Sequence, residues 1–211
     1  DTKNAKIGNL GSRLPSFPTG VVWAAGSDVE VAWTQKAWHG GGYQYRLCPA
    51  DQDLNEACFQ KMPLRFVGNS SLRWGGIGGE QLFFNTTERG WDVDEGTVPE
   101  GSMWRKCPLP RGPWNWARSG ASFEPVCEES DECKAAHQHP PRCLGPDKPC
   151  ECKCSGDGIG DLPQLEIVDK VHIPASLKPG NYVVGWRWDC EESTQIWTSC
   201  SDVTISSFVL I

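Results

Sequence analysis

Residues 180–205 constrain the fold most, because they predict two strands joined by a short loop. In the first half of this stretch, apolar residues occupy every second position, which is the period of a strand with one buried face. The residues on that face are Tyr182, Val184, Trp186, Trp188 and Cys190. After the loop, Val203 and Ile205 continue the alternation. We therefore predict a β-hairpin at the centre of a β-sandwich.

Two cysteines flank the predicted loop of this hairpin. Cys190 and Cys200 enclose nine residues. We expect a disulfide between them, which would hold the ends of the hairpin together. A bridge of this kind stabilises a fold by ~2 to 4 kcal/mol.

Shorter runs elsewhere also predict strands, and helical signals are nearly absent. Residues 20–25 and 29–33 predict two strands, which we expect to be adjacent. Residues 43–47 and 165–173 alternate in the same way, the second run being interrupted by Asp169. At 211 residues the chain is long enough for one core that buries roughly 70% of the unfolded surface. We expect a single all-β sandwich domain spanning residues 1–211.

Cysteines and glycosylation sequons point to secretion. The chain has 11 cysteines, which fit a disulfide framework outside the cytosol better than a set of reduced thiols. Asn69 and Asn85 each begin an N-glycosylation sequon. We expect a secreted glycoprotein of the extracellular space or cell wall. Because the cysteine count is odd, we expect one cysteine to pair with a segment upstream of Asp1 or with another chain.

A cysteine-rich insert spans residues 127–154 and contains six cysteines. His137 and His139 within it allow a zinc knuckle as an alternative. The C-x-C-x-C spacing is not that of paired C-x-x-C knuckles, so we favour a loop held by disulfides.

Charge and hydropathy argue against two classes of partner. The net charge of -7 and the lack of a Lys and Arg cluster oppose binding to nucleic acid. No apolar run approaches the ~18 residues of a membrane helix, so we expect no membrane span.

Residues 91–118 carry four tryptophans among prolines, glycines and charged residues. Flat aromatic faces in such loops can stack on the apolar faces of sugar rings. We predict that Trp104, Trp114 and Trp116 contact glycans, with burial against the edge of the sandwich as the alternative.

His39 is followed by three glycines, which permit positive φ angles and close backbone approach. From its residue type alone, His39 is either a turn residue or a metal ligand.

Three motifs resemble lytic polysaccharide monooxygenases, copper enzymes that cut chitin, cellulose and related polymers. His39 begins H-G-G-G-Y-Q-Y-R-L-C-P, E-A-C ends at Cys58, and Gln195 begins Q-x-W-x-x-C. The first two motifs are similar to the branch that includes viral fusolins. The resemblance implies an immunoglobulin- or fibronectin III-like β-sandwich with long loops. It also implies that His39 is a copper ligand and that Cys48 and Cys58 form a disulfide.

The resemblance places Gln195 and Trp197 beside the copper, with Trp197 where the family carries Tyr or Phe. Copper in these enzymes is also bound by the amine and side chain of an N-terminal histidine. Because the given chain begins with Asp1, we expect a non-catalytic domain associated with structural polysaccharide or extracellular matrix.

Two alternatives stay open for the function. One is a copper-dependent monooxygenase whose N-terminal histidine lies upstream of Asp1. The other is a structural glycoprotein that self-assembles or forms an interchain disulfide. Motifs of serine hydrolases, P-loop proteins and H-E-x-x-H metalloproteases are absent from the sequence.

Overall fold

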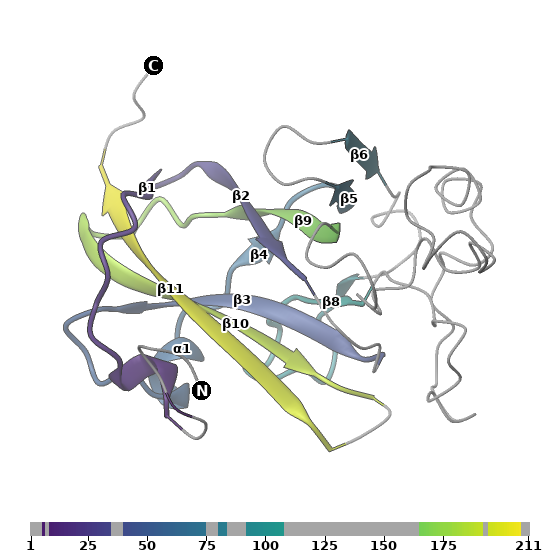
Figure 1. Ribbon diagram of the computed structural model, residues 1–211, viewed down its shortest axis with the longest axis horizontal. Helices are drawn as coiled ribbons and strands as arrows, with labels where there is room; N and C mark the ends of the chain where they lie inside the picture. The colour runs from purple at the N-terminus through teal and green to yellow at the C-terminus, as the bar shows by residue number, and fades with distance from the viewer. Residues whose placement is uncertain are drawn as a thin grey trace.

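The computed structural model describes residues 6, 9–34, 40–74, 80–83, 92–107, 165–191 and 194–207. These residues form two β-sheets stacked face to face, so the predicted all-β sandwich is confirmed (Figure 1). The described part of the chain contains a short 3-10 turn, η1 (Gly11–Arg13), and a four-residue helix, α1 (Glu56–Phe59). None of its helices is long and apolar enough to cross a bilayer.

The first sheet has six strands in the order β1-β11-β10-β3-β8-β7. Its strands are β1 (Val22–Ala24), β3 (Gly42–Pro49), β7 (Asp92–Val93), β8 (Trp104–Lys106), β10 (Gly180–Asp189) and β11 (Ile196–Ser206). The predicted hairpin is β10 and β11, in which Tyr182 lies opposite Val203 and Trp188 opposite Trp197. β3 pairs with the other side of β10, and β1 pairs with the last residues of β11, so the hairpin occupies inner positions in the strand order.

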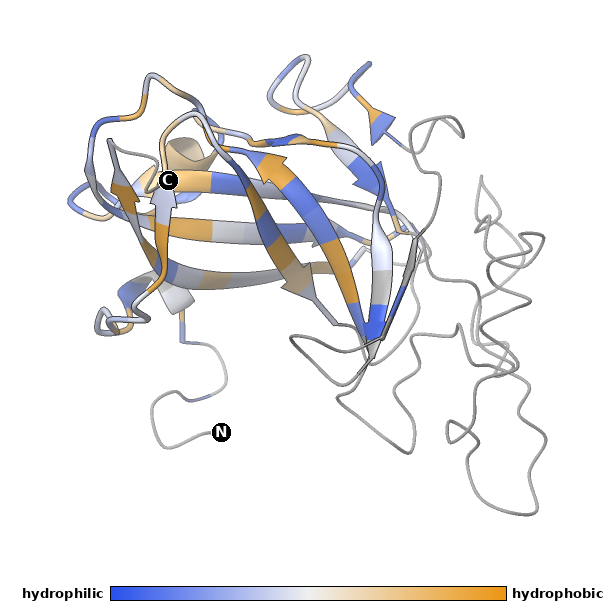
Figure 2. Cartoon of the chain, turned by 90° about the horizontal axis from the view of Figure 1, so that it is seen from above, coloured by the Kyte–Doolittle hydropathy of each residue, from blue (hydrophilic) through white to orange (hydrophobic). Residues whose placement is uncertain are grey.

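The second sheet packs against the first and has five strands. Four of them lie in the order β2-β9-β5-β6, and β4 pairs with β9. Its strands are β2 (Asp28–Trp33), β4 (Arg65–Phe66), β5 (Ser71–Trp74), β6 (Glu80–Phe83) and β9 (Leu165–His172). Figure 2 shows hydrophobic and hydrophilic residues alternating along the strands, as expected when each strand turns one face to the core.

The expectation that the first two strands are adjacent was wrong. β1 pairs in parallel with β11, whereas β2 pairs with β9 in the other sheet. The turn between them is anchored to both sheets, because Ala25 N donates to the Ser206 carbonyl and Gly26 N to the Ile173 carbonyl. Gly26 has a φ of 79°, a conformation that glycine adopts readily. The chain therefore crosses from one sheet to the other at this point.

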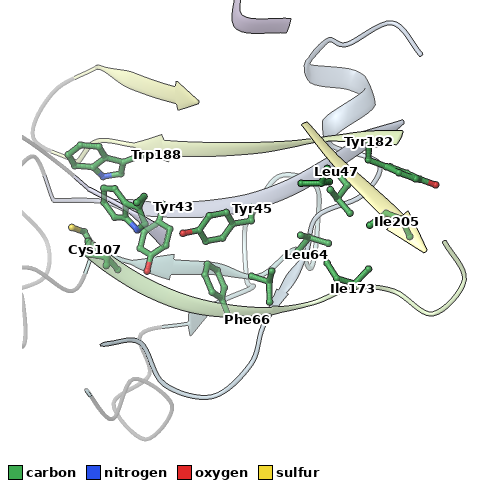
Figure 3. Close-up of a cluster of buried hydrophobic side chains, with 14 residues drawn as sticks. Tyr43, Tyr45, Leu47, Leu64, Phe66, Cys107, Ile173, Tyr182, Trp188 and Ile205 are labelled. Atoms are coloured by element: carbon green, nitrogen blue, oxygen red, sulfur yellow. The ribbon is translucent and has the colours of Figure 1, made fainter. Parts of the chain in front are cut away.

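Aromatic and aliphatic side chains fill the space between the sheets (Figure 3). Tyr43, Tyr45 and Leu47 of β3 point into this core, as their alternation predicts. Trp33 packs against Tyr43 with ring centroids 4.8 Å apart and against Trp186 at 4.7 Å. Such tilted aromatic contacts contribute ~0.5 to 1.5 kcal/mol each beyond area burial.

A disulfide between Cys48 and Cys58 covers the outer face of the first sheet, and this prediction is confirmed. It fixes α1 against the sheet, so that Phe59 packs on the backbone of Gly185. A Cβ at Gly185 would lie 2.9 Å from the Phe59 ring, so only glycine allows this approach. Strand β3 is consequently buried on both faces.

The predicted disulfide between Cys190 and Cys200 was wrong. Cys200 lies opposite Gly185, whereas Cys190 follows Asp189, the residue opposite Ile196. Five residues of strand, roughly 17 Å, separate their positions along the hairpin. A disulfide needs Cα atoms within ~7 Å, so these two cysteines do not form one with each other.

Candidate functional site

Gly41 and Gly42, two of the three glycines that follow His39, form the floor of a groove on the outer face of the first sheet. Gly40 and Gly41 have φ angles of 61° and 73°, so the expected positive φ is confirmed. Gly42 pairs with Lys106 on one side and with Asp189 on the other. Because Gly42 has no side chain, the surface is hollow between those two residues.

Replacing Gly41 with alanine is expected to lower the free energy of unfolding by ~1 to 3 kcal/mol. A Cβ at this position would overlap the carbonyl oxygen of Asp189, and the φ angle disfavours any L side chain. Chemical denaturation measures the loss. Gly96 also has a positive φ but open space around it, so Gly96→Ala should lose less stability. Equal losses in the two variants would contradict a tight junction at Gly41.

The groove has a cavity volume of about 580 Å³. The strand register brings Trp104 of β8 and Arg187 of β10 to the same level as Gln44 of β3. Three further segments complete the walls: Gln60 after α1, the 96–98 loop, and Glu191 beyond β10. One aromatic ring, several hydrogen-bonding side chains and the 96–98 loop therefore surround Gly41 and Gly42.

Arg187 is held in place by carboxylates on two elements. Its Nε and Nη2 donate to Asp189 at 2.6 and 2.9 Å, and its Nη1 donates to Glu56 of α1 at 2.8 Å. The guanidinium carbon lies 5.9 Å from the Trp104 ring centroid, within reach of a cation–π contact. The hydrogen bonds that Arg187 donates to Asp189 raise the pKa of Arg187, so its positive charge is permanent and is balanced by the neighbouring carboxylates.

Glu56 joins the groove to the disulfide-linked helix. It accepts hydrogen bonds from Arg46 at 2.5 Å and from Gln60 at 3.1 Å, in addition to that from Arg187. Burial alone would raise the pKa of Glu56, but Arg46 and these partners lower it below its usual value. Glu56 is therefore ionised at neutral pH and orients both arginines.

Trp104 is half-buried, and its indole nitrogen is enclosed. Within the described ranges, Trp104 Nε1 has no hydrogen-bond acceptor. The groove therefore exposes part of the aromatic surface of Trp104, which suits stacking contacts.

The structure brings some of the predicted site residues together and leaves others outside the groove. Of the predicted stacking residues, Trp104 lines the groove. Trp197 lies on β11, and Gln195 directly precedes that strand. Both residues are exposed, and neither lines the groove. Asn69 is exposed, as a glycosylation site requires. The remaining predicted sites lie outside the described residues: His39, Trp114, Trp116, Asn85 and the 127–154 insert.

Copper ligation by His39 stays a prediction. Gly40, the residue after His39, accepts a 2.7 Å hydrogen bond from Trp188, which lies opposite Trp197 in β11. The strand order thus brings the chain next to His39 and the Gln195–Trp197 segment to the same end of the first sheet. No three His, Cys, Asp or Glu side chains in the described part of the chain are grouped to bind a metal.

A second polar cluster lies inside the core, at the position where the sequence showed an interrupted strand. Asp169 is 1% exposed and accepts hydrogen bonds from Ser70, Tyr43 and Tyr45. Its partner charge is Arg105, whose Nη1 lies 3.3 Å from Asp169 Oδ1. Burial raises the pKa of Asp169, and Arg105 and Ser70 act against that rise.

Arg105 has hydrogen-bond partners for each of its guanidinium nitrogens. It donates two bonds to Asp92 at 2.7 and 2.9 Å and one to the Gly68 carbonyl at 3.0 Å. Burial alone would lower the pKa of Arg105, but the Asp92 hydrogen bonds raise it above its ordinary value. The guanidinium also lies 4.3 Å above the Phe66 ring. Because the side chains of Arg105 and Asp169 are fully buried, this cluster supports the fold.

Sequence reasoning missed Arg187 and Asp189 as groove residues. Their signal was present, because two opposite charges two residues apart in a strand lie on the same face. Lys106 carried no such signal, because its place in the groove depends on β8 pairing with β3. Glu56 carried none either, because its contact with Arg187 depends on α1 packing beside β10.

Comparisons with known proteins identify no family for this chain. No family model matches, and no curated protein matches. Among solved structures, a family 123 glycoside hydrolase from Clostridium perfringens is similar, with 9% identity and a TM-score of 0.30. The match covers 90% of this chain and 23% of that protein. A TM-score this low carries no argument about fold or function.

Proposed function

We propose that this chain is a secreted β-sandwich domain that binds structural polysaccharide of the chitin or cellulose type. The observation that carries the proposal is the groove in which Trp104 and Arg187 lie at the level of Gln44, beside Gly42 and Asp189. Its volume of about 580 Å³ falls within the range of ordinary small-ligand sites. A short segment of a sugar polymer would fit such a groove.

The groove offers the two kinds of contact that a pyranose ring needs. An aromatic ring can cover the apolar C–H face of the sugar, and polar side chains around it can bond to the hydroxyl groups. Gln60, Asp189 and Glu191 provide acceptors, and Arg187 and Gln60 provide donors. Because Asp189 and Glu56 already neutralise Arg187, the groove favours an uncharged polymer over an acidic one.

Two observations support an extracellular location within this proposal. The Cys48–Cys58 disulfide is the kind of bond that persists in oxidising compartments. Asn69 is exposed at the start of its sequon. Copper-dependent oxidation of the same polymers is a second candidate function, supported by the presence of the disulfide that the monooxygenase resemblance implies.

Titration calorimetry with soluble oligosaccharides of chitin and of cellulose tests the proposal. We expect the natural sequence to bind at least one of them, and Trp104→Ala to bind it at least ten times more weakly. A tenfold loss equals ~1.4 kcal/mol, which is the order of one stacking contact. Phe17→Ala is the matched control, because Phe17 is an aromatic residue that is 72% exposed and lies outside the groove.

Two results would overturn the proposal. One is the absence of binding to either oligosaccharide by the natural sequence. The other is an equal loss of affinity in Trp104→Ala and Phe17→Ala, with both variants retaining the circular dichroism and melting temperature of the natural sequence.

A further inference from the structure

Among the described residues, no strand pairs with the outer edge of β11 along its first half. Its lower-numbered residues pair with β10 on one side, while β1 covers only Thr204 to Ser206 on the other. Residues 196–201 are all exposed. Ile196 and Trp197 are 55% and 49% exposed, which places two large apolar side chains at this edge.

The direction of the backbone groups follows from the neighbouring hydrogen bonds. Thr204 N donates to Val21 O of the β1 segment, and the Asp202 carbonyl accepts from Thr19 Oγ1. Since backbone groups alternate along a strand, the N–H and C=O groups of Ile196 and Thr198 also point away from β10. Among the described residues, these four groups have no backbone hydrogen-bond partner.

The usual protections of an exposed edge are missing from this strand. Natural edges are blocked by prolines, charged side chains or bulges. Residues 194–201 contain no proline and no charged residue. Two copies can therefore approach here without like-charge repulsion, although each chain has a net charge of -7.

We propose that two copies of this chain pair through their β11 edges in antiparallel orientation, with Trp197 opposite Trp197 of the partner. In this register, Ile196 lies opposite Thr198 of the second copy. The outward groups of both residues then form four hydrogen bonds across the two-fold axis. The two tryptophans occupy the non-hydrogen-bonded position between them, where side chains lie closest.

The proposed register avoids the segments that cover the rest of β11. Each β11 begins at Ile196, and Ile196 of the second copy lies opposite Thr198 in this register. The second copy's strand therefore extends along this β11 only as far as about Ser199. η1, whose Gly11 packs against Cys200, and β1 both lie beyond that point. The paired segment is short, so the dimer is expected to be weak and to form in a concentration-dependent way. This inference does not depend on glycan binding in the groove.

Sedimentation velocity over a concentration series from ~1 to ~500 μM tests this inference, because weak interfaces dissociate within that range. The natural sequence is expected to shift from monomer to dimer. Thr198→Pro removes an N–H that points outward, so it leaves the β10 pairing intact and blocks the edge. It should weaken the dimer at least tenfold, whereas the matched control Thr198→Val should not. Trp197→Ser, which leaves the backbone unchanged, should also weaken the dimer at least tenfold.

Three results would overturn the inference. The natural sequence could stay monomeric at every concentration. The dimer could persist in both Trp197→Ser and Thr198→Pro, which would place the interface elsewhere. The chain could also stay monomeric while chitin or cellulose oligosaccharides quench the fluorescence of Trp197, which would make this strand edge a glycan-binding surface instead.

Discussion

Replacing Arg105 with methionine is expected to lower the free energy of unfolding by ~3 to 5 kcal/mol. Arg105 is fully buried and lies 3.3 Å from Asp169, which is also buried. Methionine fills much of the same volume but leaves the Asp169 carboxylate without its positive partner. An uncompensated buried charge is among the most destabilising defects in a protein core.

Urea denaturation at pH 7 measures this loss, with Arg65→Met as the control. Arg65 is exposed on β4, so its replacement should change the free energy of unfolding by less than about 0.5 kcal/mol. The double variant Arg105→Met with Asp169→Asn should recover part of the loss, because it removes both charges together. A single variant as stable as the natural sequence would contradict the role given to this pair.

The loss of unfolding free energy caused by Arg105→Met should become smaller as the pH falls. Burial raises the pKa of Asp169, and Arg105 is the strongest influence that lowers it. Without Arg105 the folded state therefore binds a proton at Asp169 more tightly than the unfolded state does. Lowering the pH below the folded-state pKa neutralises the buried charge, so the deficit relative to the natural sequence shrinks as the pH falls.

Removing the Cys48–Cys58 disulfide by a double alanine substitution is expected to cost about 3 kcal/mol. The two cysteines are 10 residues apart. Closing a loop of that length lowers the conformational entropy of the unfolded chain, which stabilises the folded state by about this amount. The loss also affects the groove, because the disulfide fixes α1 and α1 carries Glu56, which orients Arg187. Affinity for the oligosaccharide should fall together with stability.

Chemical denaturation and calorimetry on the same material measure both effects, and Cys200→Ser is the control. Cys200 is exposed and forms no disulfide within the described residues, so its replacement should leave stability and affinity nearly unchanged. A double alanine variant that is less stable but binds with full affinity would contradict the claim that the disulfide shapes the groove.

Local pattern predicted the strands of this fold well. The alternating apolar residues of β3 and β10 identify both strands and the faces that form the core, because a two-residue period is characteristic of a strand with one buried face. Pairing between strands was harder to predict. Strands β1 and β2 follow each other in sequence yet enter different sheets, since the Gly26 turn bonds to Ser206 and Ile173, two residues far along the chain.

Asp169 shows why a buried polar residue is difficult to interpret from sequence. In the alternation of β9 it resembled a break, although it occupies the inward position of a continuous strand. Its partners come from β3, β8 and the segment before β5, and no local pattern connects them. The Cys190–Cys200 prediction failed for a related reason, since the hairpin register places the two residues at different levels.

The candidate site was predictable in part. Trp104 and the glycine run were identified from composition alone, because aromatic residues among prolines and consecutive glycines are unusual. The groove itself depends on Gly42 lying between Lys106 and Asp189, which follows only from the pairing of β8, β3 and β10.

The most direct test of glycan binding is the indole N–H resonance of Trp104, followed by NMR while a chitin or cellulose oligosaccharide is added. The proposed function predicts a saturable shift of this resonance, while the buried indole of Trp33 in the core stays unchanged. An unchanged Trp104 resonance at an oligosaccharide concentration that shifts other surface residues would contradict the groove as the glycan site.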